Sequence, residues 1–330
     1  MAGSRQKVYS RRVYLYSFGG LCLFVLIYWH WWTTTCCSVG SSTGMNNSEF
    51  RVNIFNNSVV TDSGSMESST FKVMTWNLQG LMRAELEKRT DAVKSVILKE
   101  EPDAVLFQEL ITSSYQQLVN SLSNYDSVLG TDENRGGYFT GIFYNKQRLN
   151  VQSREIRRFK NSVMDRSLLI LKLSLGKIKI ALLTTHLESL PHFKKQRLEQ
   201  LTECFEACKS VDEQYNVIFG GDLNLEDGEE DGLAPETVKD LWIEYGSLDD
   251  LKFTWDYTEN KNEQLPDSSG EPQRRYDRLY FRCSTSFNMH TENLKLLGKD
   301  MVEGTNYHPS DHWALLETFK VSNTSQKLKL

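Results

Sequence analysis

Several acidic, amide and imidazole side chains stand directly after apolar runs that read as β-strands. Asn77 closes MTWN, Glu109 closes VLFQE, His186 follows LLTT, and Asp222 and Asn224 close VIFGGDLN. Layered α/β domains assemble their sites where strands end. Carboxylates are rarely buried unless they pair with a charge or bind a metal ion. These five residues at four strand ends therefore predict one shared site, built for metal or phosphate chemistry.

The pair Asp311–His312 follows Pro309 and Ser310 and precedes the apolar run WALLETF. An aspartate next to a histidine can orient the imidazole, or can join it at a metal ion or a phosphate. A lone histidine is more often a structural residue. Together with the strand-end residues, however, this pair predicts two further members of the site.

Short apolar runs alternate with helical patterns between Phe71 and Phe319, which is typical of a layered α/β domain. We predict one catalytic domain over residues 71–320. Its predicted strands are Lys72–Asn77, Ala104–Glu109, Gly141–Asn145, Leu168–Leu173, Lys177–Leu183, Val217–Asp222, Arg278–Arg282 and Ala314–Phe319. Its predicted helices are Ala84–Lys99, Ser114–Leu122, Phe193–Lys209 and Thr237–Tyr245.

The N-terminal part differs in composition. Residues 1–12 are basic, and residues 13–32 are apolar and free of charged side chains, with aromatic residues at both ends. This pattern predicts a single transmembrane helix, with a cleaved signal peptide as the alternative. Residues 33–70 read as a disordered tether, and residues 321–330 as a tail. The positive-inside rule places the catalytic domain away from the cytosol.

The overall charge and the cysteines exclude some classes of function. The 330-residue chain has a formal net charge of −5, so contacts with nucleic acid must come from local basic clusters. None of the six cysteines forms a C-x-x-C pair, which argues against a structural zinc site.

The segments TWNLQG, LFQEL, HLES, GGDLNLED, RRYDRLYFR and PSDHW occur in the order found in the endonuclease/exonuclease/phosphatase superfamily, which the chain resembles over Phe71–Phe319. The resemblance implies an α+β fold, a four-layered αββα sandwich of the deoxyribonuclease I type. It implies Mg²⁺, or Mn²⁺, held by Glu109, and water positioned by Asp222 and Asn224. Asn77 and His312 would hold the phosphate, with Asp311 orienting His312. His186 would complete the catalytic set.

Within that superfamily, TWNLQGL, GGYFTGIFY, THLES, TWD, RYDRLYFR and PSDHWALL resemble the tyrosyl-DNA phosphodiesterase 2 group. This implies a monomeric, nuclear enzyme that hydrolyses 5′-phosphotyrosyl bonds to DNA in the repair of topoisomerase adducts. The substrate-binding residues implied are Tyr138, Arg166, Ser189, Trp255, Arg275 and Tyr276.

One position departs from that group. The group pattern GDTNLRD has an arginine that faces the phenolic leaving group, whereas this chain has Glu226. An acid there should repel a phenolate. Four alternatives therefore stay open: a membrane-anchored nuclease acting on DNA or RNA, a sphingomyelinase-like lipid phosphodiesterase, an inositol-polyphosphate phosphatase, and an inactive binding scaffold.

Overall fold

The computed structural model describes residues 70–131, 137–263 and 272–323. The segment 13–32, for which the sequence predicts a membrane span, lies outside these residues, as do residues 1–12 and the tether up to residue 69. No helix within the described ranges is long and apolar enough to cross a membrane.

The first sheet has six strands and is antiparallel except for one parallel pair, β1 and β2. Helix α1 (Leu86–Glu100) connects this pair, and α2 (Thr112–Ser121) follows β2. The strand order is β13 (Phe287–Leu297), β14 (Ala314–Asn323), β1 (Thr70–Asn77), β2 (Ala104–Leu110), β4 (Phe139–Asn145) and β3 (Tyr125–Leu129). Strand β14 continues to Asn323, so the start of the predicted tail belongs to the sheet.

The second sheet also has six strands, with one parallel pair, β7 and β8, connected by α3 (Lys194–Ser210). Its order is β5 (Leu149–Arg158), β6 (Ser167–Leu175), β7 (Ile178–His186), β8 (Tyr215–Asp222), β12 (Asp277–Arg282) and β9 (Lys239–Asp240). Helix α4 (Leu241–Glu244) follows β9, and β10 (Trp255–Asp256) pairs with β11 (Gln273–Arg274) as a separate two-stranded ribbon.

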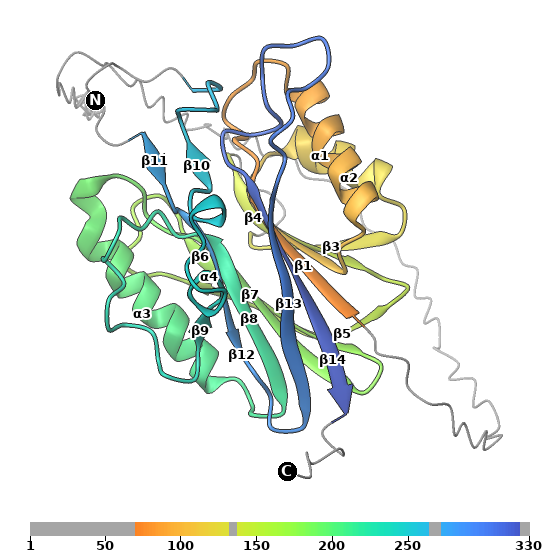
Figure 1. The fold of residues 1–330 in the computed structure, drawn as a ribbon, viewed down its shortest axis with the longest axis vertical. Helices are drawn as coiled ribbons and strands as arrows, with labels where there is room; N and C mark the ends of the chain where they lie inside the picture. Colours follow the sequence, from red (N-terminus) through yellow and green to blue (C-terminus); the bar gives the residue numbers. More distant parts are fainter. Residues whose placement is uncertain (1–69, 132–136, 264–271, 324–330) are drawn as a thin grey trace, which may run out of the picture. The chain divides into compact units, whose positions relative to one another are not determined.

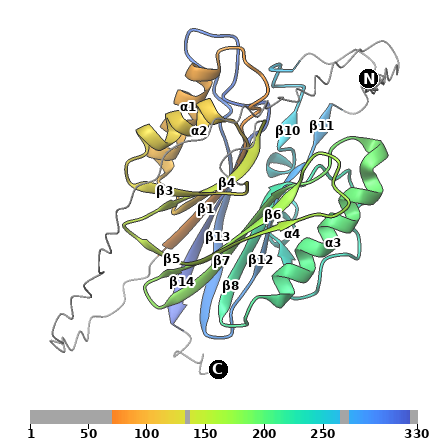
Figure 2. The ribbon, with the colours of Figure 1, turned by 180° about the vertical axis from the view of Figure 1, so that it is seen from behind.

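Three buried apolar clusters define the layers of the domain. One lies between the two sheets and includes Phe71, Leu182 and Phe319. A second packs α3 on the second sheet, and a third packs α1 and α2 on the first sheet. Figure 1 shows α1 and α2 on the outer face of the first sheet and α3 on the outer face of the second, and Figure 2 shows the same order from behind. The predicted αββα layering agrees with this arrangement.

Each of the eight predicted strands is present, with ends displaced by a few residues. The predicted helix Thr237–Tyr245 is wrong in its first half, where Lys239–Asp240 pair with β12 as strand β9. Asp240 then caps the short helix α4, because its side chain accepts a hydrogen bond from the backbone N–H of Trp242 (3.0 Å). A polar residue pair in a two-residue strand leaves no periodic pattern that the sequence could reveal.

The parallel strand pairs bring the predicted site residues to one end of the sandwich. His186 and Asp222 are paired across β7 and β8, and Asn77 ends β1 beside β2. Gly221 (φ +144°) allows the close approach of β7 and β8 here, because a Cβ at this position would lie 2.1 Å from the carbonyl oxygen of Thr185.

Candidate active site

Asp222 lies at the centre of the site and receives hydrogen bonds on both carboxylate oxygens. Asn77 Nδ2 donates to Oδ2 (2.8 Å), and the backbone N–H of Asn224 donates to Oδ1 (3.0 Å). His186 Nε2 and His312 Nε2 lie 3.3 and 3.9 Å from Oδ2. Burial opposes ionisation of Asp222, but its histidine neighbours and these hydrogen bonds hold its pKa below the ordinary value. Asp222 is therefore an oriented carboxylate anion.

Asn77 connects the two predicted catalytic carboxylates. Its Oδ1 accepts a hydrogen bond from the backbone N–H of Gln79 (2.9 Å), which turns Nδ2 toward Asp222 and, at 3.5 Å, toward Glu109 Oε1. Glu109 has φ +54°, a left-handed conformation that costs free energy for a residue with a Cβ. The backbone is thus strained at the point where it aims Glu109 into the site.

Glu109 has the properties of a carboxylate that needs a cation. It is partly exposed, and burial together with the charges of Asp311 and Asp222 raises its pKa to about 7. Among the described residues, no group of three or more acidic, histidine or cysteine side chains could by itself hold a metal ion. Magnesium retains several water ligands and needs only one or two protein carboxylates, so this donor set fits Mg²⁺ better than a closed zinc cage.

His312 is oriented by Asp277, which contradicts the predicted role of Asp311. His312 Nδ1 lies 2.7 Å from Asp277 Oδ2 at the start of β12. Burial alone would lower the pKa of His312, but the carboxylates of Asp277 and Asp311 raise it well above the ordinary value. The charge of Asp311 acts on Glu109, and Asp311 Oδ1 lies 3.4 Å from Ser310 Oγ. His312 is therefore an imidazolium held by a strand of the second sheet.

His186 behaves differently from His312. Burial and the positive charge of Arg166 lower its pKa to about 3, so it is neutral. Its Nδ1 has no hydrogen-bond partner among the described residues. The two histidines beside Asp222 thus differ in charge: His186 is neutral, and His312 is positively charged.

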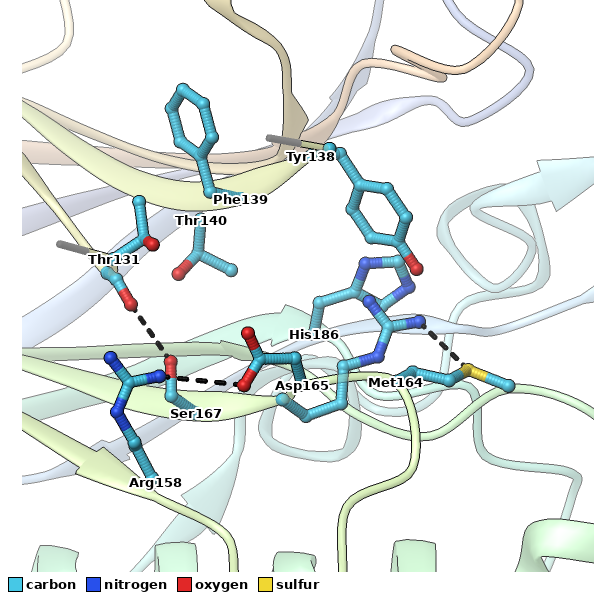
Figure 3. A pocket seen from close by; sticks show the side chains of 12 residues that line it. Thr131, Tyr138, Phe139, Thr140, Arg158, Met164, Asp165, Ser167 and His186 are labelled. Carbon is cyan, nitrogen blue, oxygen red and sulfur yellow. Dashed lines mark hydrogen bonds and ion pairs between the residues drawn. The ribbon is translucent and has the colours of Figure 1, made fainter. Parts of the chain in front are cut away.

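A pocket of about 170 Å³ opens beside His186. Figure 3 shows Tyr138 and His186 side by side at one end of it, with Met164 and Asp165 below. The guanidinium of Arg166 lies over the Tyr138 ring, 5.1 Å from its centre, and donates a hydrogen bond to Met164 Sδ (3.5 Å). The predicted substrate residues Tyr138 and Arg166 therefore lie together, as a cation–aromatic pair.

The other predicted substrate residues occupy two places. Ser189 lies near Met164, since its hydroxyl is 3.4 Å from Met164 Sδ. Tyr276 lies on the far side of His312, with ring centres 6.2 Å apart, and 5.9 Å from the ring of Trp255. Trp255 is only 9% exposed, so most of its surface packs within the protein.

Arg275 does not face the site. It is 5% exposed, pairs with Asp240 (2.8 Å) and Glu230 (3.3 Å), and stacks over Trp242. Its neighbours in the sequence have other partners, since Arg274 pairs with Glu226 and the ring of Tyr276 lies 6.2 Å from that of His312. The predicted role of Arg275 in substrate binding is therefore replaced by a structural one.

Replacing Arg275 with Gln should lower the free energy of unfolding by about 1–3 kcal/mol, because buried Asp240 loses its cation at 2.8 Å and keeps only Arg278 at 3.9 Å. Urea denaturation of the variant and of the exposed-site control Arg83→Gln would measure this, with the control within about 0.5 kcal/mol of the parent. Normal stability together with weaker oligonucleotide binding would restore Arg275 as a substrate ligand.

Three residues of the site escaped prediction. Asp277 stands in the segment RRYDRLYFR, whose predicted site residues are only Arg275 and Tyr276. Gln108 is fully buried and donates to Thr184 Oγ1 (3.1 Å), so it links the two sheets beneath the site. Ser310 donates to the backbone carbonyl of Asn77 (2.6 Å). The available signal for each was a polar residue next to a predicted site residue: Tyr276, Glu109 and Asp311, respectively.

The sequence profile of the Endonuclease/Exonuclease/phosphatase family matches residues 74–312. Tyrosyl-DNA phosphodiesterase 2 from Rattus norvegicus is 35% identical over 257 residues, which cover 77% of this chain and 68% of that protein. The Homo sapiens protein of the same name is 33% identical over 258 residues, covering 77% and 69%.

Solved structures show the same relationship. The crystal structure of the D. rerio protein (TDP2) complexed with single-strand DNA product has a TM-score of 0.72 and 32% identity, and it covers 76% of this chain and 99% of that one. Truncated Caenorhabditis elegans TDP2 has a TM-score of 0.69 and 33% identity, with 76% and 97% covered. The chain therefore belongs to the endonuclease/exonuclease/phosphatase family of metal-dependent phosphodiesterases and, within it, to the tyrosyl-DNA phosphodiesterase 2 group.

Proposed function

We propose that the chain hydrolyses the phosphodiester bond between a tyrosine side chain and the 5′ end of DNA, as a monomer that uses Mg²⁺, or Mn²⁺ in its place. The observation that carries the proposal is the meeting of Glu109 and Asp222 from different sheets, with the Asn77 amide between them. The DNA product bound to the D. rerio relative supports a nucleic-acid substrate.

Glu109 would hold the cation. When bound, a divalent ion neutralises phosphate charge and stabilises the oxygens that attack and leave. Asp222 would accept the proton of the attacking water, because it is anionic and fixed by Asn77 and Asn224. His312, held as an imidazolium by Asp277, would donate to a phosphate oxygen on which charge develops.

The surroundings would hold the two parts of the substrate. The pocket with Tyr138 and Arg166 offers an aromatic face and a cation to a departing tyrosine, and Ser189 lies beside Met164 at its edge. On the other side of His312, the ring of Tyr276 could stack on the terminal base, with Trp255 packed behind it.

The proposal is tested by incubating the full-length chain and Mg²⁺ with four substrates: 5′-phosphotyrosyl DNA, DNA with a plain 5′-phosphate, RNA and sphingomyelin. Faster release of tyrosine than of any other product supports the proposal. Preferential cleavage of plain DNA or RNA would indicate a general nuclease, and cleavage of sphingomyelin a lipid phosphodiesterase. An inert protein that still binds DNA would indicate a scaffold.

Asp277→Asn should shift the alkaline limb of the pH profile of kcat/KM to lower pH by about one unit or more. The asparagine keeps an acceptor oxygen but removes the charge that raises the pKa of His312, so the imidazolium deprotonates at lower pH. Asp311→Asn should shift the limb less, because Asp311 has no hydrogen bond to the ring. An equal or larger shift for Asp311→Asn would return the orienting role to Asp311.

We also propose that residues 13–32 anchor the chain in a membrane by a single pass, with the catalytic domain away from the cytosol. The charge-free apolar run and the preceding basic residues support this. Endoglycosidase treatment should then increase gel mobility through sequons at Asn46 or Asn56. If the mobility is unchanged and a protease digests the catalytic domain in intact microsomes, the domain faces the cytosol or nucleoplasm, as the tyrosyl-DNA phosphodiesterase 2 group implies.

A further inference from the structure

Glu226 and Arg274 form an ion pair at the edge of the active site, with Glu226 Oε2 3.0 Å from Arg274 Nε. Arg274 stands on β11 opposite Trp255 of β10, and Trp255 forms an isolated bridge with His312. Trp255 thus connects the backbone of Arg274 to that of His312, the imidazolium that would hold the reacting phosphate.

Tyr276 interacts both with this ion pair and with His312. Its ring faces His312, and both Glu226 and Arg274 act on its hydroxyl. Burial, followed by the charge of Glu226, raises the pKa of Tyr276 to about 12, whereas Arg274 opposes this rise. A nucleotide stacked on Tyr276 would thus bring its own phosphate into the field of both charges.

The loop that carries Glu226 is held in place by three buried arginines. The backbone N–H of Glu226 donates to Glu229 Oε2 (3.1 Å), and Arg197 binds both carboxylate oxygens of Glu229 (2.8 Å each). Arg275 and Arg278 pair with Glu230. The backbone at Glu226 is thereby fixed, while its side chain is 40% exposed and can turn away.

We propose that Glu226 is a specificity-determining residue that competes with the substrate for Arg274. It holds Arg274 in the free protein, and a backbone phosphate next to the scissile one must displace it to bind the guanidinium. The inference rests on the proposed nucleic-acid substrate. A ligand without that second phosphate leaves the ion pair intact and gains nothing from Arg274, so Glu226 lowers the affinity for oligonucleotides without changing that for mononucleotides.

The test measures the affinity of the full-length chain for a single-stranded DNA oligonucleotide at several salt concentrations. All proteins carry Asp222→Asn to stop turnover, and they differ at Glu226 and Arg274. Glu226→Gln should tighten binding by about three- to ten-fold at low salt and steepen the slope of log Kd against log salt by about 0.7, as expected for one more phosphate contact on a single strand.

The double variant separates competition from simple charge repulsion. Arg274→Gln should cost at least about three-fold more affinity when combined with Glu226→Gln than when Glu226 is present, because the guanidinium contacts phosphate more readily when it is not paired with Glu226. The matched control Glu206→Gln, which removes an exposed acid paired with Lys209 on α3, should change Kd by less than about two-fold.

Equal costs of Arg274→Gln in both backgrounds would overturn the competition, because independent charges act additively. That result leaves the proposed function intact if the chain with Asp222 still cleaves 5′-phosphotyrosyl DNA. If none of the variants bound the oligonucleotide and the chain with Asp222 cleaved no substrate, both the competition for Arg274 and the proposed function would be overturned.

Discussion

Glu109→Gln is expected to reduce kcat/KM for phosphodiester hydrolysis by roughly 10³-fold or more, because a neutral amide cannot balance a divalent cation. The same variant should lose its stabilisation by Mg²⁺. Ligand present at 100 times its Kd stabilises a protein by about 2.7 kcal/mol, which corresponds to a rise in Tm of roughly 5 °C or more for a domain of this size.

Thermal unfolding with and without Mg²⁺ separates a lost cation from a damaged fold. The variant without Mg²⁺ should be at least as stable as the parent, because Glu109 is repelled there by Asp311 and Asp222. Glu87→Gln, on the exposed face of α1, is the matched control and should behave as the parent. A Glu109→Gln enzyme with normal turnover and a normal Mg²⁺-induced shift would remove Glu109 from the metal site.

Asp222→Asn should lower kcat by about 10²–10⁴-fold, the range for a lost general base, with little change in oligonucleotide affinity. In the parent chain, Asp222 accepts hydrogen bonds on both carboxylate oxygens, from Asn77 Nδ2 and from the backbone N–H of Asn224. An asparagine can accept on only one of them, so the Asn77 amide must rotate. Single-turnover kinetics and the Kd for uncleaved DNA together measure whether chemistry or binding has changed.

Asp250→Asn, at an exposed position, controls for the loss of a carboxylate and should leave both quantities unchanged. If Asp222→Asn weakened binding and kept the parent's kcat, Asp222 would be a ligand of the substrate rather than the base.

The sequence predicted which residues meet, because each stands at the end of a strong apolar run. Asn77, Glu109, His186 and Asp222 needed only the rule that strand ends share an edge. The partner of His312 could not be predicted in the same way. Asp311 is adjacent in the sequence, but neighbours in an extended chain point to opposite sides, and the ring meets Asp277 from the other sheet.

Several of the strands that are absent from the sequence prediction have no regular pattern. Strand β13 mixes polar and apolar residues and has an irregular register between Thr291 and Asn293 opposite β14. Strands β9, β10 and β11 have two residues each, and their pairing depends on long-range contacts. The burial of Arg275 likewise depends on Asp240 and Glu230, which lie 35 and 45 positions earlier.

The contact between Trp76 Nε1 and the carbonyl oxygen of His312 joins residues 236 positions apart, and β1 pairs with β14 near the two ends of the domain. A chain still being synthesised lacks the last strand of its first sheet until almost the whole domain has emerged. Contacts of such high sequence separation form late and slowly. Hydrolytic activity should therefore appear after most of the helix and strand signal during refolding, and shortened translation products should be inactive.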